Sequence, residues 1–546
     1  MTAIEEALTS RILWASRLEE SMNRSCSICA ICNLGLVLFI SWLSAQAAPA
    51  AAAEPKRGGI VTLGITRDIS VMNPLVDTGS TQKRIRDLMF EPLLAIDLKG
   101  NLQAALAEGW EVSKDGKLYT IRLRKGVKFH NGQEMTAEDA KFAIDYSINA
   151  KNGARGFAEL SIVDRAEARD KHTLNIYLKR SAPGFIYALA RIETFSVIPK
   201  ESVAEGLRNP NKFPPGTGPF KFVEWQPQQR IVFERFPDYW GHKAYVDRAI
   251  LRIIGDTTVS FTALRAGDID MTERAPYEWI KEIRDGKLKG IGIAESLYSA
   301  GRAIEFNVAD PPFNNKKLRL AVAHALDRKE ILEAAYFGFG EPSDQIYPRG
   351  HKWYFEGVPS PAYDLNKARA LLKEAGYKGE EIEMLGSMGG TQEVEIATVQ
   401  AQLKKIGMNI KIRMAERGAN VQMRRKGQYA FKLSGDPGVN PNPVDLYLPI
   451  HACESDPRNR NQNESGYCDK EVDALLRAAA AEHDENQLRA LMRKVVARLQ
   501  EDAAIVNIGH TSRFFALRDH VKGFTTAYDG EFVWGGGGLN RAWLDK

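Results

Sequence analysis

The sequence has no strong excess of charge and no bias that would set it apart from ordinary globular proteins. Lys and Arg total 74 against 69 Asp and Glu, a net charge of +5, and the hydrophobic fraction is 44%. These values exclude a disordered chain, a collagen-like chain and a coiled-coil rod. The densest basic run, Arg424–Lys426, is short and typical of a solvated loop. Because nucleic-acid binders concentrate their positive charge, we expect no nucleic acid among the partners.

The sequence also lacks the short motifs of familiar enzymes. It contains no H-E-x-x-H zinc motif and no phosphate-binding loop that ends in Gly-Lys-Ser/Thr. Gly386–Gly390 has the wrong spacing for a G-x-S-x-G nucleophile elbow, and Gly535–Gly538 indicates a flexible loop. Asp268 and Asp270 form a carboxylate pair without a partner nucleophile, which favours a turn or a strand end. The nine histidines show no metal-ligand spacing, so we expect no metal site. Because the catalytic motifs are also missing, we expect no cofactor and no enzymatic activity.

The five cysteines are few, and three of them lie in the N-terminal region around an apolar run. This run, residues 28–43, is short for a membrane span of roughly 20 residues. An arginine precedes it and an A-x-A site, Ala45–Ala47, follows it, which predicts a cleaved secretory signal peptide over 1–47 and a linker over 48–56. The competing interpretation is an uncleaved anchor helix, and the start at Met1 or Met22 stays open. A cleaved signal peptide of this kind predicts that the protein is located in the periplasm.

The mature chain keeps Cys453 and Cys468, fifteen residues apart in a polar stretch. In an exported protein such a pair favours a disulfide that closes a surface loop. The chain-entropy model gives such a loop a stabilisation of about 3 kcal/mol. Two free thiols are the alternative.

Short strands alternate with helices along the whole mature chain. Val61, Leu63 and Ile65 show the period of two that is typical of a strand. Thr136 and Asp139 have the spacing of a capping box and predict a helix start. No internal repeat is visible, and the mixture of elements predicts an α/β architecture. The predicted strands are 61–65, 119–123, 174–178, 220–225 and 231–236, and the predicted helices are 136–148, 318–326 and 364–376.

Five segments occur in one order and together carry a family resemblance. They are Phe129–Ala140 (F-H-x-G-x-x-x-T-A-x-D-A), Gly216–Phe220 (G-T-G-P-F), Ala263–Asp270, Pro312–Arg328 and Tyr363–Tyr377. The chain from about residue 57 to 546 resembles the bacterial extracellular solute-binding proteins of family 5, the peptide, nickel and opine binding components of ABC importers. One such segment would be weak evidence, whereas five in order are strong.

The resemblance implies an α/β periplasmic-binding-protein fold of type II, with two lobes joined by a hinge and an extra α/β domain inserted in lobe I. Ligand bound between the lobes contacts both of them only when they close, so binding shifts the open–closed equilibrium. A membrane ABC permease would then recognise the closed form, and a monomer is expected. The implied divisions are 57–85, 203–305 and 508–546 for lobe I, 86–202 for the inserted domain, and 306–507 for lobe II.

The resemblance also points to ligand-binding residues. Peptide-binding members use an Asp in a W-x-x-D segment for the peptide's ammonium group, and Leu433–Asp436 occupies that place, which makes Asp436 and the adjacent Gly435 candidates. The competing interpretation is that Asp436 only starts a turn. Thr66, Arg67 and Asn307 are further candidates, with Arg67 either a carboxylate partner or a surface residue.

The leading hypothesis is a periplasmic receptor that captures di- or oligopeptides for an ABC importer. Leu433 replaces the aromatic residue of the peptide binders, so an opine, an oligosaccharide or a metal chelate is the alternative ligand within the same class. Two hypotheses of other classes are an exported hydrolase or transferase, and an envelope protein that binds unfolded chains without closing.

Overall fold

A computed structural model describes the chain over residues 54–69, 73–76, 80–97, 101–192, 194–202, 213–388, 390–436, 442–453, 463–526, 533–534 and 537–546. Within these ranges only the backbone is described at residues 80–82, 297–299, 417, 436 and 533–534. The predicted signal peptide, residues 1–47, and most of the predicted linker, 48–56, lie outside the described residues, so both stay predictions.

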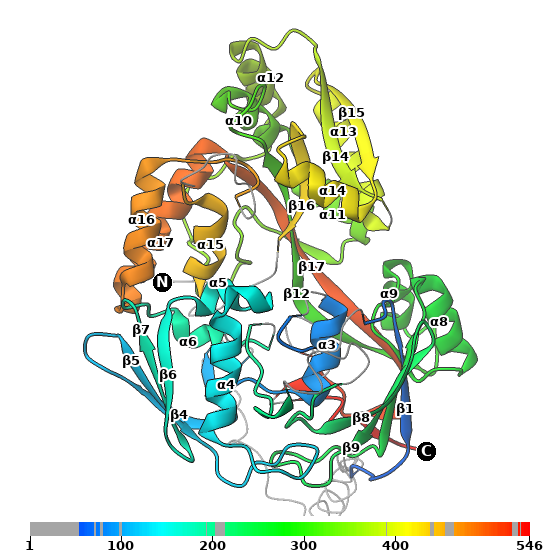
Figure 1. The fold of residues 1–546 in the computed structure, drawn as a ribbon. Helices are drawn as coiled ribbons and strands as arrows, with labels where there is room; N and C mark the ends of the chain where they lie inside the picture. The colour runs from blue at the N-terminus through cyan, green and yellow to red at the C-terminus, as the bar shows by residue number, and fades with distance from the viewer. Residues whose placement is uncertain are drawn as a thin grey trace, which may run out of the picture. The chain divides into compact units, whose positions relative to one another are not determined.

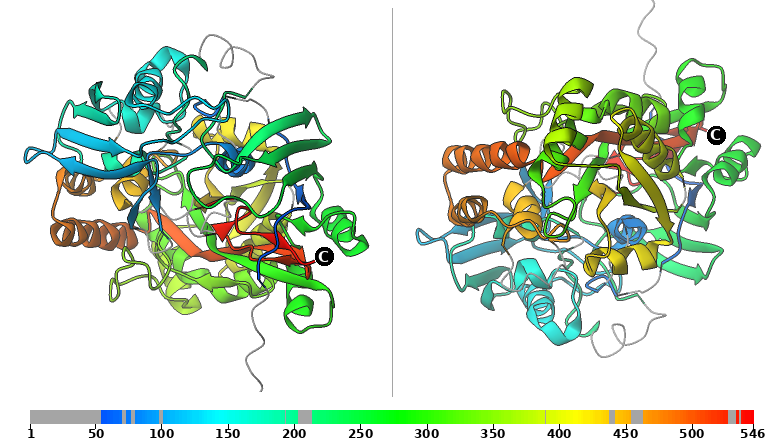
Figure 2. Two further views of the ribbon diagram at one scale, coloured as in Figure 1. Left: turned by 90° about the horizontal axis from the view of Figure 1, so that it is seen from below. Right: turned by 90° about the horizontal axis from the view of Figure 1, so that it is seen from above.

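Two long antiparallel strands connect the two lobes (Figure 1). β12 (Ile291–Phe306) and β17 (Ile505–Arg518) pair along most of their length, and they lie side by side in both views of Figure 2. At one end β17 also pairs with a strand of lobe I, and at the other end β12 pairs with a strand of lobe II. The register of the ladder shifts between Ser296 and Ala300, so the regular pairing is interrupted where the chain passes between lobes.

Lobe I is built on parallel strands whose apolar faces are fully buried. β1 pairs in parallel with β10 on one side and with β11 on the other, and its Val61, Leu63 and Ile65 are 0% exposed. Alternation along β1 therefore places these side chains in the core, as predicted. The elements here are β1 (Ile60–Ile65), α3 (Ser80–Met89), β8 (Phe220–Gln226), β9 (Arg230–Arg235), β10 (Arg248–Ile253), α8 (Thr257–Ala266), β11 (Met271–Thr272) and α9 (Tyr277–Arg284).

The residues predicted to form the inserted domain contain a separate four-stranded antiparallel sheet of order β4-β5-β7-β6. Helix α4 begins at the predicted capping box, in which Asp139 accepts hydrogen bonds from the backbone N–H and the hydroxyl of Thr136 at 2.8 and 2.9 Å. The elements here are β2 (Leu94–Ile96), β3 (Leu102–Ala104), β4 (Ala107–Val112), β5 (Leu118–Leu123), α4 (Ala137–Ile148), η1 (Ala150–Asn152), α5 (Phe157–Leu160), β6 (Val163–Asp170), β7 (Thr173–Leu178) and α6 (Phe185–Ala188).

A half-buried carboxylate holds the junction between the inserted domain and lobe I. Glu91 follows α3, and its two oxygens accept hydrogen bonds from the Tyr239 hydroxyl at 2.8 Å and from the Trp240 indole N–H at 2.9 Å. The guanidinium of Arg124 lies over the Trp240 ring, 4.4 Å from its centroid. Burial raises the pKa of Glu91 to about 7, although the two hydrogen-bond donors oppose this shift.

Lobe II has its own parallel strands, in the order β15-β14-β16, which join β12 of the shared sheet. Its helices form two groups, one packed on this sheet and the other, α15–α17, around a separate apolar cluster. The elements are α10 (Lys316–Ala325), α11 (Arg328–Tyr336), β13 (Gly340–Pro342), α12 (Leu365–Glu374), β14 (Glu381–Ser387), α13 (Thr391–Lys404), β15 (Asn409–Ala415), α14 (Arg417–Arg425), β16 (Phe431–Asp436), α15 (Pro443–His451), α16 (Lys470–Ala481) and α17 (Glu485–Asp502).

The structure confirms the predicted α/β class, and it corrects two local predictions. Arg424 and Arg425 belong to the end of α14 rather than to a loop, and Arg424 forms an ion pair with Glu464 at 3.2 Å. The described part of Gly535–Gly538 is a strand, since β20 (Gly537–Gly538) pairs with β19 (Val533–Trp534). The glycine-rich segment predicted a loop because it has no apolar side-chain pattern. The strand forms nevertheless, since its backbone groups pair with those of β19. Two further short strands, β18 (Val521–Lys522) and β21 (Trp543–Leu544), pair with each other.

The predicted lobe boundaries at 305/306 and 507/508 fall near the lobe II ends of β12 and β17. The division of the chain into these ranges stays a prediction.

Candidate functional site

The carboxyl ends of the parallel strands of both lobes point toward the interrupted part of the β12–β17 ladder. In lobe I, β1 and β11 run in parallel and β11 is antiparallel to β17, so their carboxyl ends face the hinge end of β17. In lobe II, β16 ends at Asp436, which pairs with Gly301 immediately beside the register shift. Ligands of open α/β sheets bind beyond the carboxyl ends of the strands. The candidate site is therefore the region between Thr66 and Glu273 on one side and Asp436 on the other.

Thr66, which follows β1, belongs to a buried polar cluster. Its backbone N–H and its hydroxyl both donate to one oxygen of Glu273, each at 2.6 Å, and the guanidinium of Arg84 contacts the other oxygen at 2.6 Å. Arg84 and Glu273 are 1% and 0% exposed. Burial alone would raise the pKa of Glu273, but the Arg84 charge, the Thr66 donors and Arg513 lower it to about 2.

This cluster fixes the edge of lobe I that faces the hinge. Because Glu273 stays ionised and fully paired, it holds the end of β1 against the end of β11, and Thr66 serves this arrangement with both of its donors. Sequence reasoning missed Glu273 and Arg84. The available signal was the alternation of Ile269 and Met271, which places Glu273 on the same buried face of the chain.

Arg67 is exposed at the same edge. The next residue, Asp68, anchors this segment, since it accepts hydrogen bonds from the Trp225 indole N–H at 2.9 Å and from the backbone N–H of Gln228 at 2.7 Å. The turn between β8 and β9 thus fixes the backbone that presents Arg67. Its role as a carboxylate partner stays a prediction.

Gly435 and Asp436 form the end of β16. Gly435 pairs with Arg302 of β12, and a Cβ atom added to Gly435 would lie 3.0 Å from Arg302 Nη1. Glycine is therefore the residue that leaves room for this guanidinium. The side chain of Asp436 lies outside what the structure describes, so its role as the ammonium partner stays a prediction.

Arg302 itself is committed to another partner. Its Nε and Nη2 donate to Glu395 at 3.0 and 2.6 Å, and the hydroxyl of Tyr336 donates to the same carboxylate at 3.0 Å. Burial lowers the pKa of Arg302, but Glu395 raises it by more. The guanidinium therefore stays protonated, and the Glu395 carboxylate balances its charge. Two buried ion pairs, Arg84–Glu273 and Arg302–Glu395, thus lie on the two sides of the hinge.

Asn307 lies directly after β12 and is 3% exposed. Its amide donates to the Asp310 carboxylate at 2.9 Å and to the carbonyls of Gly427 and Tyr429 at 3.1 Å each. These bonds join the end of β12 to the loop that leads into β16. The contacts are those of a residue that holds the backbone in place, and a direct ligand contact stays a prediction.

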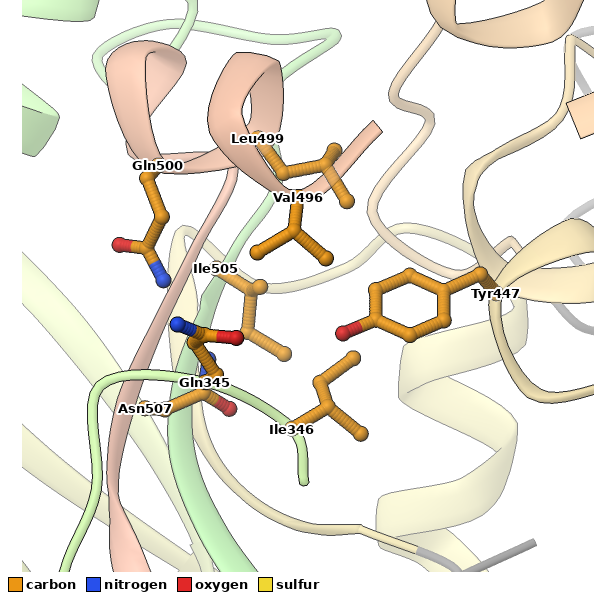
Figure 3. Close-up of a pocket in the computed structure, with 8 residues that line it drawn as sticks. All are labelled: Gln345, Ile346, Tyr447, Val496, Leu499, Gln500, Ile505 and Asn507. Atoms are coloured by element: carbon orange, nitrogen blue, oxygen red, sulfur yellow. The ribbon is translucent and has the colours of Figure 1, made fainter. Parts of the chain in front are cut away.

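A small cavity lies away from the candidate site, in lobe II between α15, α17 and the start of β17 (Figure 3). Three amide side chains face its interior, and they are engaged with the protein: Gln345 donates to the Phe355 carbonyl at 3.0 Å, and Gln500 and Asn507 donate to the Asp344 carbonyl. The space suits about one water molecule and is far too small for a peptide. The lining residues are Gln345, Ile346, Tyr447, Val496, Leu499, Gln500, Ile505 and Asn507.

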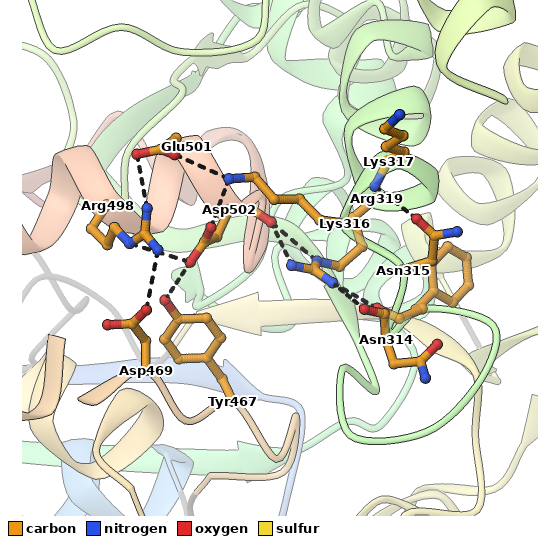
Figure 4. Close-up of polar contacts among 11 residues, drawn as sticks. Asn314, Asn315, Lys316, Lys317, Arg319, Tyr467, Asp469, Arg498, Glu501 and Asp502 are labelled. Atoms are coloured by element: carbon orange, nitrogen blue, oxygen red, sulfur yellow. Dashed lines mark hydrogen bonds and ion pairs between the residues drawn. The ribbon is translucent and has the colours of Figure 1, made fainter. Parts of the chain in front are cut away.

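A polar network holds Tyr467, the residue that precedes Cys468 (Figure 4). The Asp502 carboxylate, at the end of α17, contacts Lys316 at 2.9 Å and accepts a hydrogen bond from the Tyr467 hydroxyl at 2.9 Å. Arg319 donates to the Asp502 carbonyl at 2.8 Å and so fastens α10 to α17. Beside Tyr467 the structure joins Cys468 to Cys453, with 2.05 Å between the sulfur atoms.

The residues that the structure describes contain no cluster of three or more His, Cys, Asp or Glu side chains with a geometry that could hold a metal ion. Within the same residues no helix has both the length and the apolar character needed to cross a membrane.

Comparison with known proteins places these features in context. The family model of the bacterial extracellular solute-binding proteins, family 5, matches residues 101–457. The dipeptide-binding protein of Escherichia coli K12 is 28% identical over 77% of this chain and 83% of its own length. The periplasmic binding protein DppA of Helicobacter pylori, solved with the peptide STSA, matches 90% of this chain and 99% of its own with a TM-score of 0.77 and 26% identity. AgaA of A. tumefacien R10, solved with agropinic acid, matches 89% of this chain and 99% of its own with a TM-score of 0.75 and 26% identity.

Proposed function

Because this chain belongs to the bacterial extracellular solute-binding proteins of family 5 and has a two-lobed type II fold, we propose that it captures di- or oligopeptides for an ABC importer. A peptide would bind between the lobes, near the hinge, and the closed protein would deliver it to a membrane permease. We further propose that the protein acts as a monomer without enzymatic activity, and that it reaches the periplasm through a cleaved signal peptide.

One observation carries the proposal that the ligand lies at the hinge. The strands of both lobes direct their carboxyl ends at the interrupted segment of β12 and β17, with Asp436 beside it on the lobe II side. A ligand there would contact both lobes only in the closed form, which is the differential affinity that closure needs. By the family resemblance the proposal assigns the ligand's ammonium group to Asp436, and it assigns the ligand's carboxylate to Arg67, which is exposed at the lobe I edge that faces the hinge.

The disulfide is consistent with an exported protein. A bond between Cys453 and Cys468 persists in an oxidising compartment, whereas the cytosol would keep both thiols reduced. The native pairing should therefore be found in protein recovered from the periplasm.

A second candidate ligand is a solute other than a peptide, such as an opine, an oligosaccharide or a metal chelate. AgaA, solved with agropinic acid, matches this chain with the same 26% identity as the peptide-bound DppA. Leu433 also departs from the aromatic residue of the peptide-binding pattern. The test below separates the two ligand classes.

Thermal unfolding of the protein, washed free of co-purified solute, tests the proposal against a mixture of free peptides and the same mixture N-acetylated. A ligand present at 100 times its dissociation constant stabilises the folded state by about 2.7 kcal/mol. We expect free peptides to raise the melting temperature by several degrees and acetylated peptides to have no effect. The variant Asp436→Asn should lose the response. The control variant Asp519→Asn changes an exposed carboxylate directly after β17 and should keep the response.

No response to either mixture would refute the peptide ligand and direct the search to opines, sugars and chelates. A response to free peptides that survives in Asp436→Asn would refute the role of this carboxylate alone.

A further inference from the structure

The inserted domain and lobe II contact each other at residues outside the strands β12 and β17. The hydroxyl of Ser181, which follows β7, lies 2.6 Å from Nε2 of His483, which lies in the turn between α16 and α17. These residues are 302 positions apart in the sequence. The lobes therefore meet at a second place besides the hinge.

A backbone approach extends this second contact. A Cβ atom added to Gly184 would lie 2.0 Å from Nδ2 of Asn442 and 3.5 Å from a carboxylate oxygen of Asp445. Asn442 is the N-cap of α15, where its side-chain oxygen accepts a hydrogen bond from the backbone N–H of Val444 at 3.2 Å. The inserted domain thus presents bare backbone to the first turn of a lobe II helix.

A second glycine approaches lobe II in the same way. A Cβ atom added to Gly116 would lie 2.6 Å from the His483 ring and 2.5 Å from the Ser181 hydroxyl. The three inserted-domain positions of this contact, Gly116, Ser181 and Gly184, are all small, and any larger side chain would push the two parts of the molecule apart.

Charged groups are enclosed at the same place. Burial raises the pKa of Asp445 to about 6, while Arg191 lowers it and Glu159 raises it further. Burial also raises the pKa of Tyr187 on α6, with Glu485 and Asp445 acting in the same direction. The contact therefore excludes water from an ionisable side chain of the inserted domain, Tyr187, and from one of lobe II, Asp445.

The Ser181–His483 pair does not have the features of a catalytic dyad. His483 is exposed and Ser181 is partly exposed, and among the described residues no carboxylate is hydrogen-bonded to the other ring nitrogen of His483. A hydrolytic serine needs a histidine that a third group orients. The pair is better explained as part of an interface.

We propose that this second contact, formed by Gly116, Ser181 and Gly184 with Asn442, Asp445 and His483, holds the two lobes in the closed state. The inference rests on the proposed function, in which the protein opens and closes about β12 and β17. Those strands join the lobes at the hinge and leave the angle between them adjustable, so a contact elsewhere sets the closed angle. Its strength then determines the fraction of molecules that are closed without ligand, and the apparent affinity scales with that fraction.

Gly184 allows a selective test. Its φ and ψ angles of −67° and −18° are those of a helix, so alanine fits the backbone of the inserted domain without strain. The three atoms nearest to the added methyl group all belong to Asn442 and Asp445, both in lobe II. Gly184→Ala should therefore weaken the contact and leave each part folded. Gly292→Ala is a matched control, because its φ is not positive and no atom lies within 4 Å of its Cβ position.

The first measurement is cross-linking of the variant Gly184→Cys/Asn442→Cys in the exported protein, without added ligand. A Cβ at Gly184 lies 3.2 Å from Cγ of Asn442, which brings the two Cβ atoms close to the roughly 4 Å that a disulfide spans. We expect rapid formation of this bond under mild oxidation, detected by peptide mass analysis, and a smaller radius of gyration in solution scattering than for the reduced variant. A yield no higher than that of Gly184→Cys/Asp519→Cys would overturn the proposal.

The second measurement compares the radius of gyration of the wild type, Gly184→Ala and Gly292→Ala, alone and with a mixture of free peptides. We expect Gly184→Ala alone to be more open, with a peptide affinity about tenfold weaker and an unchanged melting temperature without peptide. Equal radii and affinities in all three proteins would overturn the proposal. If no protein binds peptides, the peptide ligand is refuted, while the cross-linking and the ligand-free radii still decide whether the contact holds the closed state.

Discussion

Glu91 provides a direct test of the electrostatics at the junction of lobe I and the inserted domain. Its carboxylate lies between the Tyr239 hydroxyl and the Trp240 indole N–H, and its pKa is raised from 4.5 to about 7 by burial. A group whose pKa is higher in the folded than in the unfolded state favours folding at low pH. Its contribution is complete below about pH 4.5 and is lost as the pH rises through about 7.

The magnitude follows from the shift. A difference of about two and a half pKa units corresponds to about 3 kcal/mol. Because Glu91 is half-buried rather than fully buried, solvent screening reduces this value, and we expect about 2 kcal/mol. Glu91→Gln mimics the protonated carboxyl, since its oxygen can accept from Trp240 and its amide can donate to the Tyr239 oxygen. The variant should therefore be more stable than the wild type at pH 8 and about equal to it at pH 4.5.

Urea unfolding at a series of pH values between 4.5 and 8 measures the effect. The wild-type free energy of unfolding should fall relative to that of Glu91→Gln as the pH rises, by about 2 kcal/mol in total. Glu138→Gln, at an exposed position of α4, is the matched control and should run parallel to the wild type. A constant difference between wild type and Glu91→Gln across this range would refute the reasoning.

Three further predictions concern the Arg84–Glu273 ion pair, the disulfide and Asp445. Arg84→Met leaves Glu273 buried without its partner and should cost about 3 to 5 kcal/mol in urea unfolding, whereas adding Glu273→Gln should recover part of the loss; no recovery would contradict the ion-pair account. Cys453→Ser should cost about 3 kcal/mol, and a reductant should lower the melting temperature of the wild type but not of this variant. Asp445, with a pKa raised from 3.8 to about 6, favours folding at low pH and loses this contribution above pH 6. Asp445→Asn should consequently be more stable than the wild type by about 2 kcal/mol at pH 8 and equal to it below pH 4, as read from melting temperatures.

Local signals in the sequence predicted several elements well. The capping box of Thr136 and Asp139 marks the start of α4, and Asp364 caps α12 through hydrogen bonds from two backbone N–H groups at 2.9 Å. The alternation of Val61, Leu63 and Ile65 gave the buried face of β1. Each of these signals depends on neighbours within a few residues, which is why a single sequence reveals it.

The buried polar contacts of the candidate site could not be predicted in the same way. Arg302 and Glu395 are 93 residues apart and Arg84 and Glu273 are 189 apart, and each looks like an ordinary surface residue in its own segment. Only tertiary packing brings them together and excludes water. Asn307 was predicted from its position between the lobes, and only the fold shows that its amide also donates to backbone carbonyls of the loop before β16. The ligand contact itself stays a prediction.

The placement of β17 also constrains the order in which the molecule can fold. Residues 505–518 supply a strand that pairs with β11 of lobe I and, through β12, borders the sheet of lobe II. A chain synthesised from its N-terminus lacks this strand until more than nine-tenths of its length has emerged, so neither lobe can complete its sheet earlier. Contacts of such large sequence separation slow folding. In fragments that end before β17, the two lobe sheets should therefore stay unfolded and protease-sensitive. The inserted domain, whose sheet spans residues 107–178, should be the part that can fold in such fragments.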